Sequence, residues 1–333
     1  MSLRATAWAC SWALALSCGL TAANTAVAEG PGPGGYPNRP VKIIVPFAPA
    51  GPTDIAARFI AAKMSENLKQ QFYIENQAGA GGNLGMGNAA KAPADGYTIL
   101  FVSSSYVVNP SLYDKVPYDP YKDFQPLTVA ATAANVLLVN PTVLPVKSAK
   151  ELADMLKANP GKYSFASAGT GTTPHLSGEL FKLTYKLDIV HVPFPGAGPA
   201  IQSIVGGHTP LAFTSLPPAV PLIKEGKLRA LAVANKTRVK VLPDVPTLEE
   251  AGSPDQEADT FQAVLVPANT PKDVAQFIYQ EVVKATKSPE VTAKMEQLGL
   301  EIICNTPEQF TQQIKTEIAK WGRVIKEAGI KAQ

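Results

Sequence analysis

The sequence predicts an α/β protein of two domains, and three observations lead to this fold class. Its 333 residues exceed what one ordinary hydrophobic core needs. Short apolar runs, typical of buried strands, repeatedly lead through Gly- and Pro-rich turns into helical patterns. Two longer apolar runs, 128–140 and 259–267, are long enough to cross between domains. We therefore expect a first domain of 39–135 with 262–333, a second of 136–261, and a ligand cleft between them.

Strands and helices alternate along most of the chain. Each domain should therefore hold a mixed, mostly parallel sheet flanked by helices, with the two crossing strands as hinge. Ser148 and Glu151 form a capping box that starts a helix, whereas the Pro-, Tyr- and Asp-rich segment 109–126 is typical of a surface excursion. Further strands, some with their turns, are expected at 72–76, 95–102, 189–196, 210–215 and 228–234, and helices at 148–159, 273–286, 289–298 and 307–328.

Composition limits the partners. The chain is 46% hydrophobic and 17% charged, as expected of a folded globular protein. Its formal net charge is only +3, and the sequence contains no block of Lys and Arg. We therefore expect no nucleic-acid partner, and we expect a monomer.

Residues 1–28 are predicted to be a signal peptide. Arg4 supplies a positive charge, 5–20 is an apolar run, and small residues precede a cleavage site after Ala28. The apolar run is short for a membrane anchor. We therefore expect an exported protein that begins with a Gly- and Pro-rich, flexible lead-in at 29–38.

The three cysteines are consistent with export. A lipoprotein modified at Cys18 is an alternative, although Ala15 stands where that signal prefers Leu. Cleavage after the signal leaves only Cys304, so no internal disulfide can form. Cys304 lies in the apolar run 300–304, which favours a buried structural thiol over a reactive one.

The segment 41–58 contains the first candidate site. An apolar strand at 41–45 meets Pro and Gly, and a helix starts at Pro52 with Asp54 in its first turn. Free N–H groups of such a turn point over the carboxyl end of the strand, where they attract carboxylate or phosphate. The candidate ligand-binding residues here are Phe47, Ala48, Ala50, Gly51, Thr53 and Asp54.

The segment 163–181 repeats this arrangement. A strand enters a loop of Gly, Ser and Thr, and a helix follows with Thr173 as its cap and Pro174 at its first position. Hydroxyls at the end of strand 95–102 either donate to a ligand or satisfy local backbone. The further candidates are Ser103, Ser104, Ser167, Ala168, Gly169, Thr170, Thr173, His175, Phe194 and Thr214.

The glycines at 79–85 do not make a dinucleotide site, because Leu84 occupies the third glycine position. The sequence also lacks a Gly-x-Ser-x-Gly elbow, a His-Glu-x-x-His motif, a Walker loop and metal-ligand spacing, so we expect no cofactor and no metal. Asp54 and His175 could form an acid/base pair of a secreted hydrolase or isomerase. The alternative, a carboxylate that fixes its turn and a locally packed histidine, favours a binding protein.

The same segments, with others spread over the chain, resemble the substrate-binding proteins of tripartite tricarboxylate transporters, the Bug or TctC-like family. The motifs that carry the resemblance are 46–54, 75–76, 79–82, 94–98, 109–113, 117–120, 123–124, 167–171, 175–176, 191–194 and 242–247.

The resemblance implies a type II-like periplasmic binding protein fold that closes on a carboxylate and delivers it to the membrane components of a transporter. An extracellular sensor that passes the closed state to a signalling partner is an alternative role. Two departures from the family, Ala50 for Gly and Phe194-Pro195 for Tyr-Lys, make the cleft more apolar. We therefore expect an aromatic dicarboxylate such as terephthalate, placed near Phe47 and Phe194.

Overall fold

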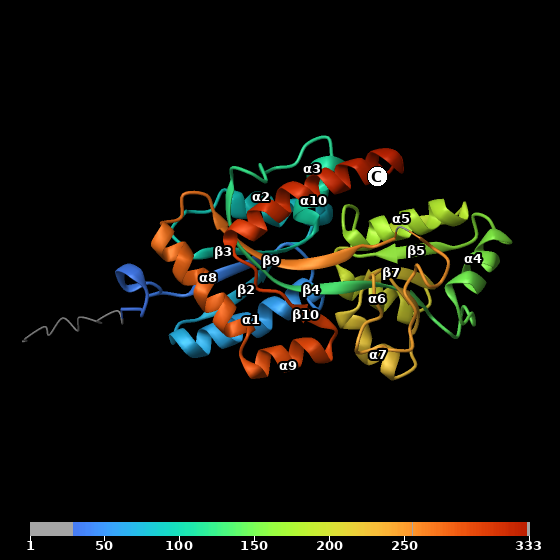
Figure 1. Ribbon diagram of the computed structural model, residues 1–333, viewed down its shortest axis with the longest axis horizontal. Helices are drawn as coiled ribbons and strands as arrows, with labels where there is room; N and C mark the ends of the chain where they lie inside the picture. Colours follow the sequence, from blue (N-terminus) through green and yellow to red (C-terminus); the bar gives the residue numbers. More distant parts are fainter. Residues whose placement is uncertain (1–28, 255, 332–333) are drawn as a thin grey trace, which may run out of the picture.

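A computed structural model describes residues 29–254 and 256–331, and Figure 1 shows two domains side by side. The predicted signal peptide and its cleavage site lie outside the described residues. None of the helices in the described ranges is long and apolar enough to cross a membrane. The strands are β1 (Val41–Val45), β2 (Phe72–Asn76), β3 (Thr98–Ser103), β4 (Phe124–Val139), β5 (Ser164–Ser167), β6 (Val190–Pro193), β7 (Leu211–Ser215), β8 (Arg229–Val233), β9 (Asp259–Pro267) and β10 (Leu300–Ile302).

Helices cover the strands on both faces. They are α1 (Pro52–Leu68), α2 (Asn83–Ala90), α3 (Ser105–Leu112), α4 (Ala149–Lys157), α5 (Thr173–Tyr185), α6 (Ala197–Val205), α7 (Val220–Lys224), α8 (Lys272–Thr286), α9 (Pro289–Gln297) and α10 (Pro307–Glu327), with 3-10 turns η1 (Pro33–Gly35), η2 (Ala80–Gly82) and η3 (Pro217–Ala219). In domain 1, α1, α8 and α9 pack on one face of the sheet, and α2, α3 and α10 on the other. In domain 2, α4 and α5 lie opposite α6 and α7.

One continuous sheet joins the domains, in the order β2-β1-β3-β9-β4-β7-β5-β6. The outer strands pair in parallel, β1 with β2 and β3, and β5 with β6 and β7. The crossing strand β4 pairs antiparallel with β9 and β10 in domain 1 and with β7 and β8 in domain 2. The predicted two-domain α/β fold is therefore confirmed. We propose that the boundaries fall where the sequence places them, at 39–135 with 262–333 and at 136–261.

The segment 109–126 differs from the expected surface excursion, because its first residues belong to the buried helix α3. Pro110 lies inside this helix and cannot donate a hydrogen bond to the carbonyl oxygen of Tyr106. The hydroxyl of Tyr118 donates to that oxygen instead, at 2.9 Å, and the two tyrosine rings stack with centroids 5.3 Å apart. A partner distant in sequence thus compensates for the proline.

Three smaller differences also have local causes. The cap of α5 is Thr172 rather than Thr173, because the Thr172 hydroxyl accepts from the N–H of His175. Part of the lead-in at 29–38 is held in place, since Tyr36 is buried and donates to the carbonyl oxygen of Gly96 at 2.8 Å. The run that contains Cys304 includes the short strand β10, and the thiol is buried as expected.

Asn135 joins three strands at the point where β4 passes from domain 1 to domain 2. Its side chain is fully buried, and its Oδ1 accepts from the Thr260 hydroxyl at 2.8 Å and the Ser215 hydroxyl at 3.2 Å. Its Nδ2 donates to the carbonyl oxygen of Ala258 at 2.8 Å. This one amide therefore links β4 to β7 and β9.

Replacement of Asn135 by Ala should lower the free energy of unfolding by about 2 kcal/mol, because it leaves buried polar groups without partners. Urea denaturation measures the effect. The matched control is Asn88→Ala, whose amide is exposed and whose loss should cost less than about 0.5 kcal/mol. An equal loss of stability in the two variants would contradict the structural role of the Asn135 amide.

Candidate functional site

A cleft lies where the two domains meet, and residues of both domains line it. Among the described residues that line it, none is charged, although hydroxyls and apolar side chains alternate around it. The lining consists of Phe47, Gly51, Pro52, Thr53, Ser103, Ala168, Thr172, Pro174, Ala197, Ser215 and Thr260.

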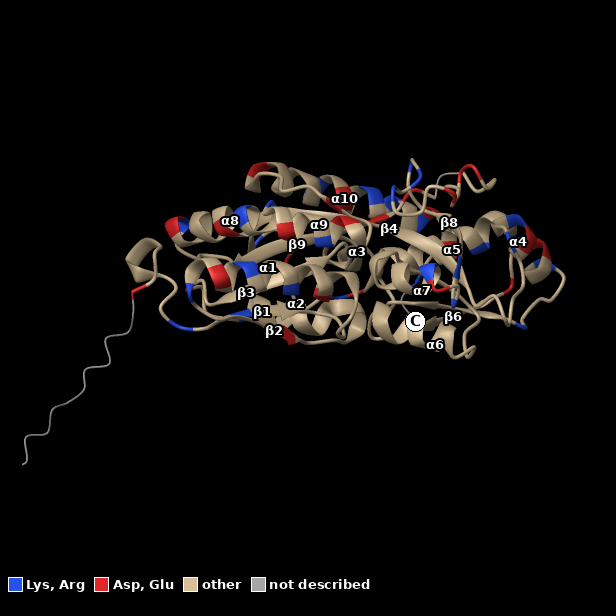
Figure 2. Ribbon diagram, turned by 90° about the horizontal axis from the view of Figure 1, so that it is seen from below, with Lys and Arg blue, Asp and Glu red and all other residues tan. Residues whose placement is uncertain are grey.

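Three helices begin at this cleft. The first residues of α1, α5 and α6, with their caps Gly51, Thr172 and Gly196, follow strands through short loops. The first N–H groups of a helix have no partner within the helix, and they carry its positive dipole end. Together these helix starts can bind an anion without a lysine or arginine. The charged residues of Figure 2 lie instead on outer helices such as α4, α8 and α10, whereas α6 is uncharged.

Asp54 supports the first loop and does not line the cleft. Its carboxylate accepts from the N–H of Ala50 at 3.0 Å, from Arg58 Nε at 2.9 Å and from Asn76 Nδ2 at 2.9 Å. Burial alone would raise the pKa of Asp54, but the hydrogen bonds from Arg58 and Asn76 outweigh it and lower the pKa below its ordinary value. The carboxylate is thus ionised and occupied by the turn, which matches the structural alternative rather than an acid/base role.

Ala50 takes an unusual backbone conformation in the same loop. Its φ is +65°, in the left-handed region that favours glycine. Its N–H points to Asp54, so this conformation is part of the turn that the carboxylate stabilises. Alanine carries more backbone strain at this φ than glycine would, and the loop forms nevertheless.

The second loop is supported from behind by His191. The Ser167 hydroxyl lies 2.7 Å from His191 Nε2 and accepts from the N–H of Gly169 at 3.2 Å. The Thr172 hydroxyl donates to the carbonyl oxygen of Gly169 at 2.7 Å. Ser167 is fully buried, so it fixes the loop while Thr172 reaches the cleft.

His175 and His191 form a buried pair next to this loop. Their ring centroids are 4.2 Å apart, and the N–H of Gly171 donates to His175 Nδ1 at 3.4 Å. Burial lowers the pKa of His175 to about 4 and that of His191 to about 3, and Lys182 contributes to both shifts. Both rings are therefore neutral at pH 7. His175 is a support of the loop in this structure and does not line the cleft.

The structure brings five of the predicted site residues into the lining, namely Phe47, Gly51, Thr53, Ser103 and Ala168. The other predicted residues lie in the supporting loops, strands and first helix turns: Ala48, Ala50, Asp54, Ser104, Ser167, Gly169, Thr170, Thr173, His175, Phe194 and Thr214. Phe194 packs against the apolar cluster beneath α6 rather than into the cleft.

Sequence reasoning missed Pro174, Ala197, Ser215 and Thr260 as lining residues, whereas Pro52 and Thr172 lie inside the two candidate loops but were not among the candidate residues. Ser215 rather than its neighbour Thr214 reaches the cleft, because adjacent side chains of a strand point to opposite faces. Gly196 was an available signal for Ala197, since a glycine between a strand and a helix also marks the first two loops. Thr260 gave no local signal.

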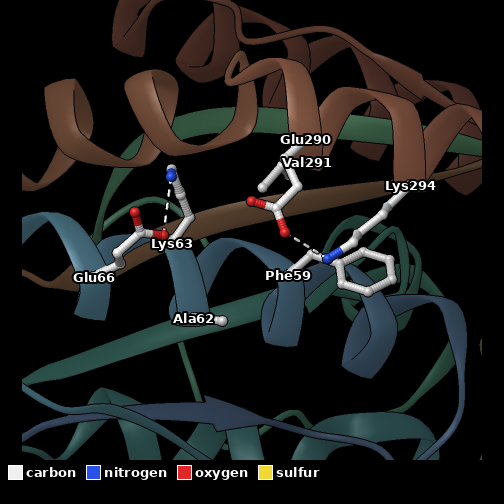
Figure 3. A pocket seen from close by; sticks show the side chains of 7 residues that line it. All are labelled: Phe59, Ala62, Lys63, Glu66, Glu290, Val291 and Lys294. Atoms are coloured by element: carbon white, nitrogen blue, oxygen red, sulfur yellow. Dashed lines mark hydrogen bonds and ion pairs between the residues drawn. The ribbon is translucent and has the colours of Figure 1, made fainter.

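A second hollow lies between α1 and α9 on the outside of domain 1 (Figure 3). Its two lysines are already paired: Lys63 with Glu66 at 2.9 Å, and Lys294 with Glu290 at 2.7 Å. Each pair lies within one helix, as is common on solvated helix surfaces. These charges are explained by the helices themselves.

A protein family and individual relatives that are similar to this chain agree with each other. The family described as "Tripartite tricarboxylate transporter family receptor" matches residues 56–330. The "UPF0065 protein in tcbD-tcbE intergenic region" of Pseudomonas sp. (strain P51) is 38% identical over 298 residues, 89% of this chain and 88% of that protein. "Protein BugT" of Bordetella pertussis is 36% identical over 298 residues, 89% of this chain and 91% of BugT.

Solved structures of similar fold include two with a named ligand. "Structure of a periplasmic transporter" is 44% identical with a TM-score of 0.86, over 89% of this chain and 99% of that one. "R. palustris Rpa4515 with adipate" is 35% identical with a TM-score of 0.86, over 90% and 100%. "MatC (Rpa3494) from Rhodopseudomonas palustris with bound malate" is 33% identical with a TM-score of 0.83, over 87% and 100%.

The histidine pair predicts how stability depends on pH. Between an unfolded-state pKa of about 6.5 and the lower folded-state values, the unfolded chain binds more protons, so acid favours unfolding. Each histidine should remove up to about 1.4 kcal/mol per pH unit in this window. Urea denaturation between about pH 7 and about pH 4.5 should show this loss of stability. The free energy of unfolding should depend less steeply on pH in His191→Gln. His208 is exposed, so His208→Gln is the matched control. The same dependence of stability on pH in wild type, His191→Gln and His208→Gln would contradict the lowered pKa of the buried histidine.

Proposed function

Because this chain belongs to the family of tripartite tricarboxylate transporter receptors, we propose that it binds a small carboxylate in the cleft between its two domains. The members of this family are solute-binding receptors and not enzymes. The observation that carries the proposal is the cleft without charged lining residues at which three helices begin. A carboxylate is an anion that such helix starts attract.

The two sides of the cleft offer groups for two carboxylates. Thr53 in domain 1 provides a free helix-start N–H and a hydroxyl. In domain 2, α5 and α6 begin at Thr173 and Ala197 and provide two further helix starts, whereas the Thr172 hydroxyl already donates to the carbonyl oxygen of Gly169. Structures similar to this chain are named with adipate and with malate, which are both dicarboxylates. We therefore infer that the ligand spans the cleft with an anionic group toward each domain.

Within this class we propose an aromatic dicarboxylate such as terephthalate. Apolar side chains of Phe47, Pro52, Ala168, Pro174 and Ala197 line the cleft and suit a ring between the two carboxylates. The expected contact with Phe194 is not part of this lining, so the proposal depends on Phe47 as the aromatic wall. An aliphatic chain would fill the same space with less stacking.

We further propose that the protein acts in the periplasm and delivers its ligand to the membrane components of a tripartite tricarboxylate-type transporter. The family description and the predicted signal peptide support this. An extracellular sensor would bind its ligand in the same cleft and pass the closed state to a signalling partner. A hydrolase or isomerase that uses Asp54 and His175 is not supported, because hydrogen bonds hold both residues in their loops.

A thermal-shift screen against aliphatic and aromatic mono-, di- and tricarboxylates tests the ligand class. A ligand that binds only the folded state at about 100 times its dissociation constant adds roughly 2.7 kcal/mol of stability. For a chain of this length the melting temperature should rise by a few degrees. We expect the largest shift with dicarboxylates, and with terephthalate above adipate. A shift equal for citrate and terephthalate would overturn the aromatic assignment, and no shift at all would overturn carboxylate binding.

Replacement of Gly51 by Val should weaken carboxylate binding at least about tenfold, because the side chain would enter the cleft beside the helix start. Gly51 has an ordinary φ of −83°, and an added Cβ would lie 3.7 Å from the N–H nitrogen of Ala197 across the cleft. Titration calorimetry measures the affinity. Cys304→Ser is the control, because this thiol contacts the carbonyl oxygen of Ala130 and does not line the cleft. Unchanged affinity in Gly51→Val would refute this placement of the site.

A further inference from the structure

The C-terminal end of α3 reaches across from domain 1 to a loop of domain 2. The Tyr113 hydroxyl donates to the carbonyl oxygen of Thr170 at 3.1 Å. One turn earlier, Asn109 Nδ2 donates to the carbonyl oxygen of Gly81 at 3.1 Å and to Asn83 Oδ1 at 2.9 Å. These two acceptors fix the orientation of the Asn109 amide. Its Oδ1 is buried and has no hydrogen-bond partner among the described residues.

Two glycines allow the domains to meet this closely. A Cβ on Gly171 would lie 2.1 Å from Asn109 Oδ1, and a Cβ on Gly81 would lie 2.0 Å from the carbonyl oxygen of Thr170. Both distances are far below any van der Waals contact. Both glycines also have positive φ, +87° and +61°. Backbone therefore packs against the opposite domain here without any intervening side chain.

The domain 2 loop in this contact also shapes the cleft. Residues 169–172 end at Thr172, which caps α5 and lines the cleft, and they follow directly on Ala168, which also lines it. Asn109, Tyr113 and Gly81 do not line the cleft. They act on the lining only through the loop that they hold.

We propose that Gly81, Asn109 and Tyr113 form a clasp on Thr170 and Gly171 that keeps the domains closed and sets the rate at which a bound ligand leaves. The inference rests on the proposed function, because it requires that the domains separate to admit and release a ligand. Separation breaks the Tyr113 hydrogen bond and withdraws the loop from α3. Asn109 and Tyr113 are thus positioning residues for ligand retention.

The first test uses adipate as the probe and compares Tyr113→Phe with Tyr121→Phe by stopped-flow kinetics. Loss of one neutral hydrogen bond from the closed state should raise the dissociation rate about 2- to 10-fold in Tyr113→Phe. The association rate should not fall, because the open form that admits the ligand is at least as populated without the clasp; a merely structural role would lower the melting temperature without raising the dissociation rate. Tyr121 is 55% exposed in the same domain, so its variant should behave as wild type. Equal dissociation rates in the two variants would overturn the role of Tyr113.

The second test uses Gly81→Ala, whose methyl group would meet Thr170 on closure. The matched control is Gly34→Ala, because Gly34 has nearly the same φ, +59°, and nothing within 4 Å of an added Cβ. Spin labels on cysteines at the exposed positions Lys91 and Lys186, in a Cys304→Ser background, report the distance between domains. The closed population should be reduced in Gly81→Ala and unchanged in Gly34→Ala.

The distance measurement separates the clasp from the ligand assignment. A smaller closed population in Gly81→Ala than in wild type, measured without ligand, supports the clasp whether or not adipate binds. Failure of adipate to bind would count only against the proposed ligand class. Identical distance distributions in wild type, Gly81→Ala and Gly34→Ala, with and without adipate, overturn the clasp even where adipate binds.

Discussion

Strand β4 hydrogen-bonds to β9 and β10 in domain 1 and to β7 and β8 in domain 2, so the relative position of the domains depends on its conformation. It runs without interruption from Phe124 to Val139, and domain motion must bend or twist it rather than rotate a free linker. Asn135 fixes the strand where it crosses between the domains, and the same hydroxyl network reaches Thr173 at the start of α5 through Thr260, at 2.6 Å. The hinge and the floor of the cleft are therefore built from the same hydrogen bonds.

The uncharged lining of the cleft has a consequence for the loops around it. In the proposed function, backbone N–H groups rather than charged side chains bind the anion, so the helix starts must be held accurately. Asp54 does this for the first loop and His191 for the second, each from outside the lining. Asp54, a candidate for acid/base chemistry in the sequence, thus serves to fix backbone, as does His191. Hydrogen bonds lower the pKa of Asp54, and burial lowers the pKa of His191.

The sequence predicted most elements because their signals are local. A Pro at the start of α1 and an apolar run before it specify that unit without knowledge of the rest. Helix α3 was missed because Pro110 argues against it locally, while the hydroxyl that compensates comes from Tyr118. Ser215 and Thr260 were missed as lining residues because their place depends on which faces of β7 and β9 meet across β4, and such pairing leaves no mark near either residue.

Neither domain surrounds the cleft alone, because Phe47, Gly51 and Thr53 come from one side and Ala168, Thr172 and Ala197 from the other. In the proposed function, a ligand therefore makes its full set of contacts only when the domains are closed, and it favours closure by the difference in its affinity for the two states. Contacts outside the cleft, such as the 3.0 Å bond from the N–H of Ala48 to the carbonyl oxygen of Pro195, favour the same state without touching the ligand. They raise affinity for every ligand equally, whereas the lining decides between ligands, so retention and specificity can change independently in this fold.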